Sequence, residues 1–187
     1  MFSSVGSVGS AISVNPNTDL RLKANWLQAN CLLVNLVKQQ LFWVSPSHEV
    51  LQSWPVATGL AGAGEQEGSG CTPRGWHRIR AKIGQGEDAR AVFRGRRPTG
   101  EIWSPELSAQ FPERDWILGR ILWLCGEETG FNRGGKVDTQ RRFIYLHAVP
   151  DTKPMGVPAS AGCINLQPAA MLAVFDLVAV GTKVLIQ

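Results

Sequence analysis

Residues 142–165 read RFIYLHAVPDTKPMGVPASAGCIN, and this stretch is the most informative part of the chain. Residues 143–146 form an apolar run that His147 closes, and they predict a strand over 142–147. Sixteen positions later, Cys163 directly follows Gly162 in a loop that opens toward a helix. Backbone N–H groups gathered in such a loop lower the pKa of a thiol and form an oxyanion site. The stretch therefore suggests a nucleophilic cysteine at Cys163, with His147 as its partner base.

Short strands separated by turns rich in Gly and Pro surround this stretch. They are predicted at residues 31–36, 41–45, 50–58, 76–81, 91–93, 116–124, 142–147 and 183–186. The first two form a hairpin, and Pro55 marks the third as an edge or bulged strand. The clearest helix spans residues 167–178, where Ala, Met, Leu and Phe recur at helical spacing. A mainly β domain is therefore expected.

Length and composition narrow the class of protein. At 187 residues the chain suits one globular domain, assigned to residues 19–187 after a small and polar arm at 1–18 that is expected to be flexible. Lys and Arg number 19 against 15 Asp and Glu, without the basic runs of a nucleic-acid binder. No apolar run is long enough to span a membrane, and no export signal is recognisable. A cytoplasmic protein is expected, or a periplasmic one if it is exported by another route.

Several common catalytic motifs are absent from the sequence. Gly130 to Lys136 has the spacing of a phosphate loop, but Val137 stands where magnesium needs a hydroxyl. No serine lies in a G-x-S-x-G elbow, and His48-Glu49 lacks the second histidine of a zinc protease. The four cysteines form no Cys-x-x-Cys pair, so neither zinc nor redox chemistry is expected, and no cofactor is predicted.

Segments of the chain resemble the L,D-transpeptidase catalytic domain, also called the YkuD domain, at residues 142–147, 155–164 and 175–184. Further similarity extends upstream, at residues 37–41, 55–59, 72–75 and 120–124. The resemblance implies a mainly β fold, a YkuD-like β-sandwich of mixed sheets with a short helix after the catalytic cysteine. It also implies a cysteine enzyme acting on the bond between an L-configured centre and the terminal D-alanine of a murein tetrapeptide or its disaccharide form.

The resemblance implies a role for each residue of the motif. Cys163 is the nucleophile that forms a thioester, and His147 is the general base. The backbone N–H groups of Gly162 and Cys163 hold the oxyanion, and a backbone carbonyl is expected to orient the imidazole. Carbapenem-type β-lactams are expected to be covalent inhibitors.

Four residues are candidates for substrate binding: Ser160, Arg142, Asn165 and Trp123. Ser160 is expected to shape the loop through hydrogen bonds, and Arg142 to anchor a carboxylate of the acidic stem. Trp123 is expected in the core or in the wall of the cleft.

Three positions depart from the pattern that the family is expected to show. Ala161 stands where many members have His, Ala148 where Gly is frequent, and Asn165 where most have Arg. The last change removes a positive charge beside the site. These departures bear on the handling of the acceptor more than on the first, acylating step.

Three functions are left open by these residues. If water resolves the acyl-enzyme, the chain is an L,D-carboxypeptidase of peptidoglycan recycling, which the lack of a recognisable export signal favours. If a second stem supplies an amine, it is an L,D-transpeptidase that forms cross-links. The third is an inactive module that binds peptidoglycan.

Overall fold

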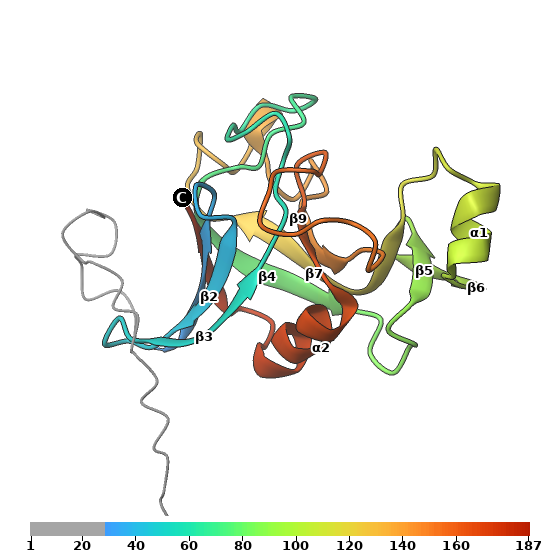
Figure 1. Cartoon of the computed structure of the whole chain (residues 1–187). Coiled ribbons are helices and arrows are strands. Elements are labelled where there is room, and N and C mark those ends of the chain that lie inside the picture. Colours follow the sequence, from blue (N-terminus) through green and yellow to red (C-terminus); the bar gives the residue numbers. More distant parts are fainter. Residues whose placement is uncertain (1–28) are drawn as a thin grey trace, which may run out of the picture.

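The computed structural model describes residues 29–187, and all strands in this part join one mixed sheet. The arm expected at residues 1–18, and residues 19–28 of the expected domain, lie outside the described residues. The elements, seen in Figure 1, are β1 (Cys31–Asn35), β2 (Gln40–Val44), β3 (Val50–Pro55), β4 (Gly75–Ile83), β5 (Ala91–Arg94), β6 (Arg97–Ile102), α1 (Pro105–Gln110), β7 (Ile117–Gly126), a 3-10 turn (Gly135–Val137), β8 (Tyr145–Ala148), β9 (Ile164–Leu166), α2 (Pro168–Leu177) and β10 (Lys183–Ile186).

The strands follow the order β3-β2-β1-β10-β4-β7-β5-β6, and β8 joins the sheet through β7 and carries β9 on its other side. Only β1–β10 and β8–β9 are parallel pairs among these strands. Figure 1 places β2 and β3 at one end of the molecule, and β5, β6 and α1 at the other. The mainly β fold with mixed strand directions, and the helix that follows the cysteine segment, are confirmed.

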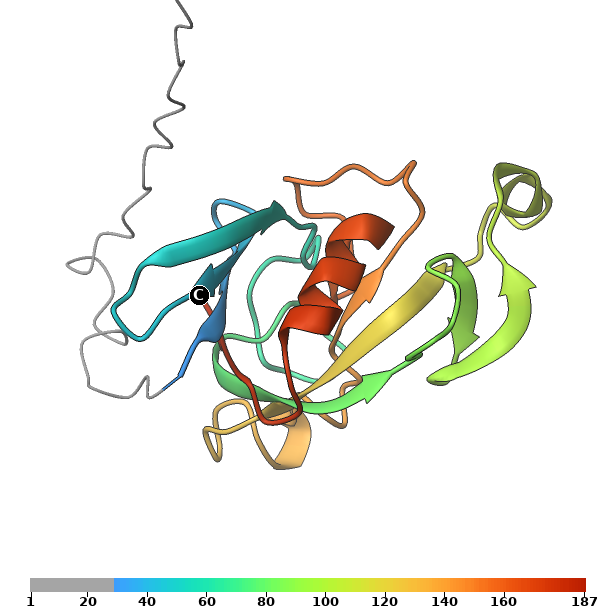
Figure 2. The ribbon, with the colours of Figure 1, turned by 90° about the horizontal axis from the view of Figure 1, so that it is seen from below.

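Helix α2 packs against the sheet at β7 and β8 (Figure 2). Met171, Val174 and Phe175 are fully buried at helical spacing, and burying side chains of this size contributes about 1.5–3 kcal/mol each. Lys82 of β4 closes the end of the helix, because its Nζ donates to the carbonyls of Phe175 and Val178, both at 2.6 Å. In the described part of the chain, no helix has the length and apolarity needed to cross a membrane.

The predicted hairpin is confirmed as the antiparallel pair β1–β2, and β3 lies at the sheet edge as Pro55 indicates. The strand predicted at 142–147 begins only at Tyr145. Residues before it form a turn, in which the Arg142 N–H donates to the Asp138 carbonyl at 2.9 Å. Strands β6 and β9, helix α1 and the 3-10 turn were not predicted from the sequence.

Candidate active site

Strands β8 and β9 bring His147 and Cys163 to one face of the sheet. Their parallel register pairs His147 with Asn165, so Cys163 stands one step beyond the ladder, opposite Tyr145. Side chains two positions apart on a strand share a face, so all four project to the same side. A cavity of about 320 Å³ opens there, with His147 and Cys163 in its wall.

The turn before the nucleophile requires glycine and is closed by two hydroxyl groups. Gly162 has φ +116°, and a Cβ on it would lie 2.9 Å from the Cys71 carbonyl oxygen. Ser160 Oγ donates to the Cys163 carbonyl at 2.6 Å and accepts from the Gly162 N–H at 3.1 Å. Thr72 Oγ1 donates to the Gly162 carbonyl at 3.0 Å. The expectation that Ser160 shapes this loop is confirmed.

The same contacts bear on the oxyanion site. The Gly162 N–H is engaged by Ser160 Oγ and must leave it before it can bind an oxyanion. The N–H groups of Gly162 and Cys163 therefore stay predicted oxyanion ligands.

Burial favours the neutral form of the Cys163 thiol. Sγ donates to the Phe143 carbonyl at 3.5 Å and accepts from the Tyr145 N–H at 3.4 Å. Burial raises the pKa of Cys163 to about 11, and the Tyr145 N–H and the Arg142 charge only partly oppose this. The expectation that the loop lowers the pKa of this thiol is therefore wrong, because desolvation outweighs the N–H groups near the sulfur.

His147 is neutral as well, and its tautomer follows from one contact. Its Nδ1 lies 2.9 Å from the Ala148 carbonyl oxygen, which can only accept, so Nδ1 carries the hydrogen and Nε2 offers a lone pair. Burial lowers the pKa of His147 below its ordinary value, although the Ala148 carbonyl opposes the shift. A backbone carbonyl orients the imidazole, as expected. Burial thus favours the neutral forms of both side chains.

The structure brings two of the four candidate binding residues to the cavity. Ser160 and Asn165 line it, and the buried Asn165 Oδ1 has no hydrogen-bond partner in the described part of the chain. Its main chain is fixed by mutual bonds with Ala57, at 2.8 and 3.0 Å. A buried oxygen without a partner is costly, and the role of Asn165 in substrate binding stays a prediction.

Arg142 and Trp123 do not line this cavity. The half-buried Arg142 guanidinium donates to the carbonyls of Gly64, Glu65 and Cys71 at 3.1, 2.8 and 2.6 Å. These bonds hold the glycine-rich loop at residues 59–70. Arg142 must break them before it can anchor a substrate, and that role stays a prediction. Trp123 stacks on Phe143 with a centroid distance of 6.2 Å and donates to the Gln140 carbonyl.

Sequence reasoning missed some residues of the cavity wall. Asp115 and Ile117 contribute from the segment that enters β7, and Leu60 from the glycine-rich loop. Lys153 Nζ lies 3.9 Å from Asp115 Oδ1 across the wall. No local pattern marks Asp115, whereas Tyr145 beside the thiol follows from its position two residues before His147. Among residues 29–187, no group of three or more His, Cys, Asp or Glu side chains could hold a metal ion.

Solved structures with the same fold are distant in sequence. Bd1075 of Bdellovibrio bacteriovorus is 16% identical with a TM-score of 0.53, and the match covers 84% of this chain and 47% of that one. L,D-transpeptidase 3 from Mycobacterium tuberculosis is 15% identical with a TM-score of 0.51, over 85% and 61%. The L,D-transpeptidase LdtMt1, solved with imipenem, is 19% identical with a TM-score of 0.50, over 85% and 59%. The chain thus spans about half to three fifths of these proteins.

No curated protein matches the chain. The family model of the L,D-transpeptidase catalytic domain, YkuD, matches residues 29–186, which is nearly everything that the structure describes. The chain therefore belongs to the L,D-transpeptidase catalytic domain (YkuD) family.

Proposed function

We propose that the protein is a cysteine acyltransferase that cleaves the bond before the terminal D-alanine of a murein tetrapeptide stem. One observation carries this proposal: a neutral imidazole with a free Nε2 and a thiol behind a glycine turn face the same cavity. Membership of the L,D-transpeptidase family supports the choice of substrate.

The neutral pair sets the order of proton transfers. His147 Nε2 takes the Sγ proton of Cys163 as the sulfur–carbon bond forms, and the Cys163 N–H stabilises the oxyanion. One such donor is typically worth about 3 kcal/mol. The imidazolium then gives its proton to the amide nitrogen, the carbon–nitrogen bond breaks, and D-alanine leaves a thioester on Cys163.

We favour water as the group that resolves this thioester, which makes the protein an L,D-carboxypeptidase. The rim of the cavity is open, because Leu60 is 75% exposed and the Asp115 side chain 74% exposed. Water reaches the acyl carbon there without a second binding site, whereas an amine has to be held. A role in peptidoglycan recycling and a cytoplasmic setting stay predictions.

Transpeptidation is the second candidate, because a second cavity adjoins the first and could hold an amine acceptor. Incubation with purified disaccharide tetrapeptide, with and without an amine acceptor, separates the two by mass spectrometry. Tripeptide and free D-alanine alone are expected from hydrolysis. Cross-linked or exchanged products would replace the carboxypeptidase proposal with the transpeptidase.

Two variants and one inhibitor test the shared chemistry. Cys163→Ala and His147→Ala are each expected to abolish release of D-alanine, whereas Cys71→Ala, which removes another half-buried thiol, is the matched control. Imipenem is expected to add its mass to the wild-type protein and not to Cys163→Ala. Wild-type protein that neither releases D-alanine nor forms this adduct would instead be the inactive binding module.

A further inference from the structure

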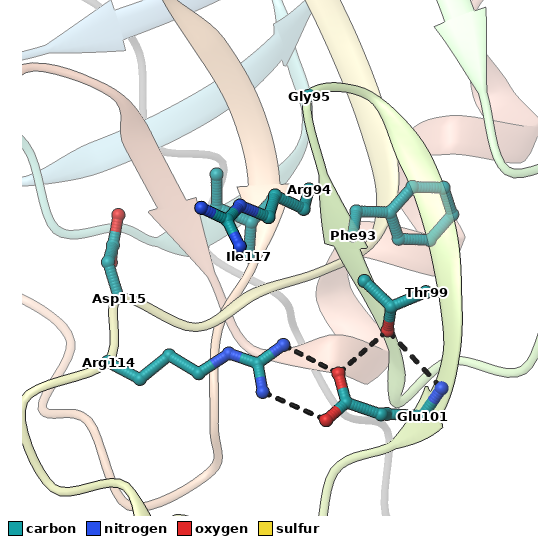
Figure 3. A pocket seen from close by; sticks show the side chains of 8 residues that line it. All are labelled: Phe93, Arg94, Gly95, Thr99, Glu101, Arg114, Asp115 and Ile117. Atoms are coloured by element: carbon teal, nitrogen blue, oxygen red, sulfur yellow. Dashed lines mark hydrogen bonds and ion pairs between the residues drawn. The ribbon is translucent and has the colours of Figure 1, made fainter.

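A second cavity lies between the β5–β6 hairpin and the segment that enters β7 (Figure 3). Its volume is about 620 Å³. Asp115 and Ile117 belong to the walls of both this cavity and the catalytic one. The two cavities therefore share part of their walls, and the second adjoins the one that Cys163 lines.

Two of the charged side chains in this cavity, Arg114 and Glu101, form an ion pair with each other. Arg114 donates to both carboxylate oxygens of Glu101, at 2.9 and 2.6 Å, and its guanidinium lies over the Trp116 ring at 4.3 Å. The hydrogen bond from Arg114 is the main reason that the pKa of Glu101 falls to about 2. This bidentate pair, drawn with dashed lines in Figure 3, fixes one wall and leaves little net charge there.

Arg94 is different, because this exposed residue lines the cavity and its guanidinium has no partner among residues 29–187. Within residues 29–187, its side chain makes no hydrogen bond or ion pair, and no dashed line reaches it in Figure 3. The side chain extends from the last residue of β5, next to the hairpin turn. An unpaired guanidinium in a cavity is suited to a planar, bidentate anion such as a carboxylate.

The reaction proposed above supplies such a carboxylate. The nitrogen of the scissile amide belongs to D-alanine, whose own carboxylate is free, and an amine acceptor of the α-amino-acid type has the same arrangement. This holds whichever amino acid stands third in the stem. Once free, the amino acid also carries an ammonium group, so it matches a site with a carboxylate, Asp115, at the junction and a guanidinium, Arg94, beyond it.

We propose that the second cavity binds the α-amino-acid group on the amine side of the scissile bond, with its carboxylate on Arg94. This inference rests on the proposed function. D-alanine leaves through this site after the carbon–nitrogen bond breaks. In the transpeptidase alternative, an α-amino-acid acceptor held in this site would attack the thioester in the reverse sense: a carbon–nitrogen bond forms, the carbon–sulfur bond breaks, and the amine proton passes through His147 to Cys163 Sγ.

A pair of substrates tests this assignment: the tetrapeptide with D-alanine at its end, and the same peptide with D-alanine amide. Wild-type kcat/KM is expected to be about tenfold or more higher for the carboxylate, because one charge-assisted contact is lost in the amide. Arg94→Ala is expected to lower the rate on the carboxylate to that on the amide and to leave the amide unchanged. Arg94→Lys keeps the charge and should retain part of the preference.

Arg97→Ala is the matched control, since Arg97 pairs with Arg94 across the hairpin but does not line the cavity. It is expected to keep the wild-type preference for the carboxylate. Equal wild-type rates on both substrates, or an equal loss on both in Arg94→Ala, would overturn the site and leave the proposed function standing. Wild-type protein that releases no D-alanine from the tetrapeptide would overturn the proposed function, and the site with it.

Discussion

The protonation state of Cys163 can be titrated directly. Burial raises the pKa of this thiol from 9.0 to about 11, so its ionised fraction near neutral pH is about 100-fold below that of an ordinary thiol. At pH 7 about one molecule in 10,000 carries the thiolate. We therefore expect the alkylation rate of Cys163 to rise about tenfold per pH unit from pH 6 to pH 10, without a plateau.

Alkylation by iodoacetamide, quenched at intervals and mapped by peptide mass spectrometry, measures this rate for Cys163 alone. Mapping is needed because Cys71 is a second half-buried thiol. Cys163→Ala gives the background for the whole protein. The His147→Ala variant is expected to keep the same pH dependence, because a neutral imidazole does not stabilise a thiolate.

A plateau between pH 6 and pH 8 would refute this reasoning. It would mean that Cys163 and His147 rest as a thiolate and an imidazolium, and that the N–H groups of the loop outweigh burial. A loss of alkylation at neutral pH in His147→Ala would also indicate a resting thiolate and imidazolium. The first proton transfer would then precede substrate binding rather than accompany attack.

Three further predictions concern stability. Burial lowers the pKa of His77 to about 4 and favours the neutral ring. The stability that this neutral ring contributes is therefore present above pH 6.5 and is lost as the pH falls through 4. Urea unfolding at pH 5 should show a loss of about 2 kcal/mol in the free energy of unfolding, and His77→Gln should remove this loss. Gly162→Ala should lower stability by about 1–3 kcal/mol in the same assay, and an unchanged midpoint would contradict the strain argued from φ +116°. Thr72→Val should cost about 1–3 kcal/mol and activity, because the Gly59 N–H loses its acceptor, whereas Thr72→Ser should restore both.

Local patterns account for the part of the fold that the sequence predicts well. β1 and β2 are short, continuous apolar runs joined by a turn, and α2 buries residues at helical spacing, so these elements are visible without tertiary contacts. β6 contains Pro98 and Gly100, which indicate a turn, and it is a strand because it pairs with β5. β9 has three residues and exists through its parallel bonds to β8. α1 had a usable signal, since Ser104 caps it before Pro105.

The candidate site also contains residues that could be predicted from the sequence and residues that could not. Cys163 and His147 lie in one recognisable motif, so their pairing could be predicted, whereas Asp115 reaches the cavity from a segment without a local pattern. The pKa of the thiol could not be predicted, because it depends on how much water the fold excludes from the sulfur. Arg142 shows the same limit, since its hydrogen bonds to the loop follow from tertiary contacts alone.

The parallel pairing of β8 with β9 has a consequence for how this domain could diversify. The spacing between base and nucleophile is set by neighbouring strands, which lie about 4.8 Å apart, and not by the connection from 149 to 159. Insertions or exchanged sequences in that connection would alter what sits over the cavity while the reacting atoms keep their places. A library randomised there, with Ser160 to Cys163 held constant, is thus a rational start for changing substrate preference without rebuilding the chemistry.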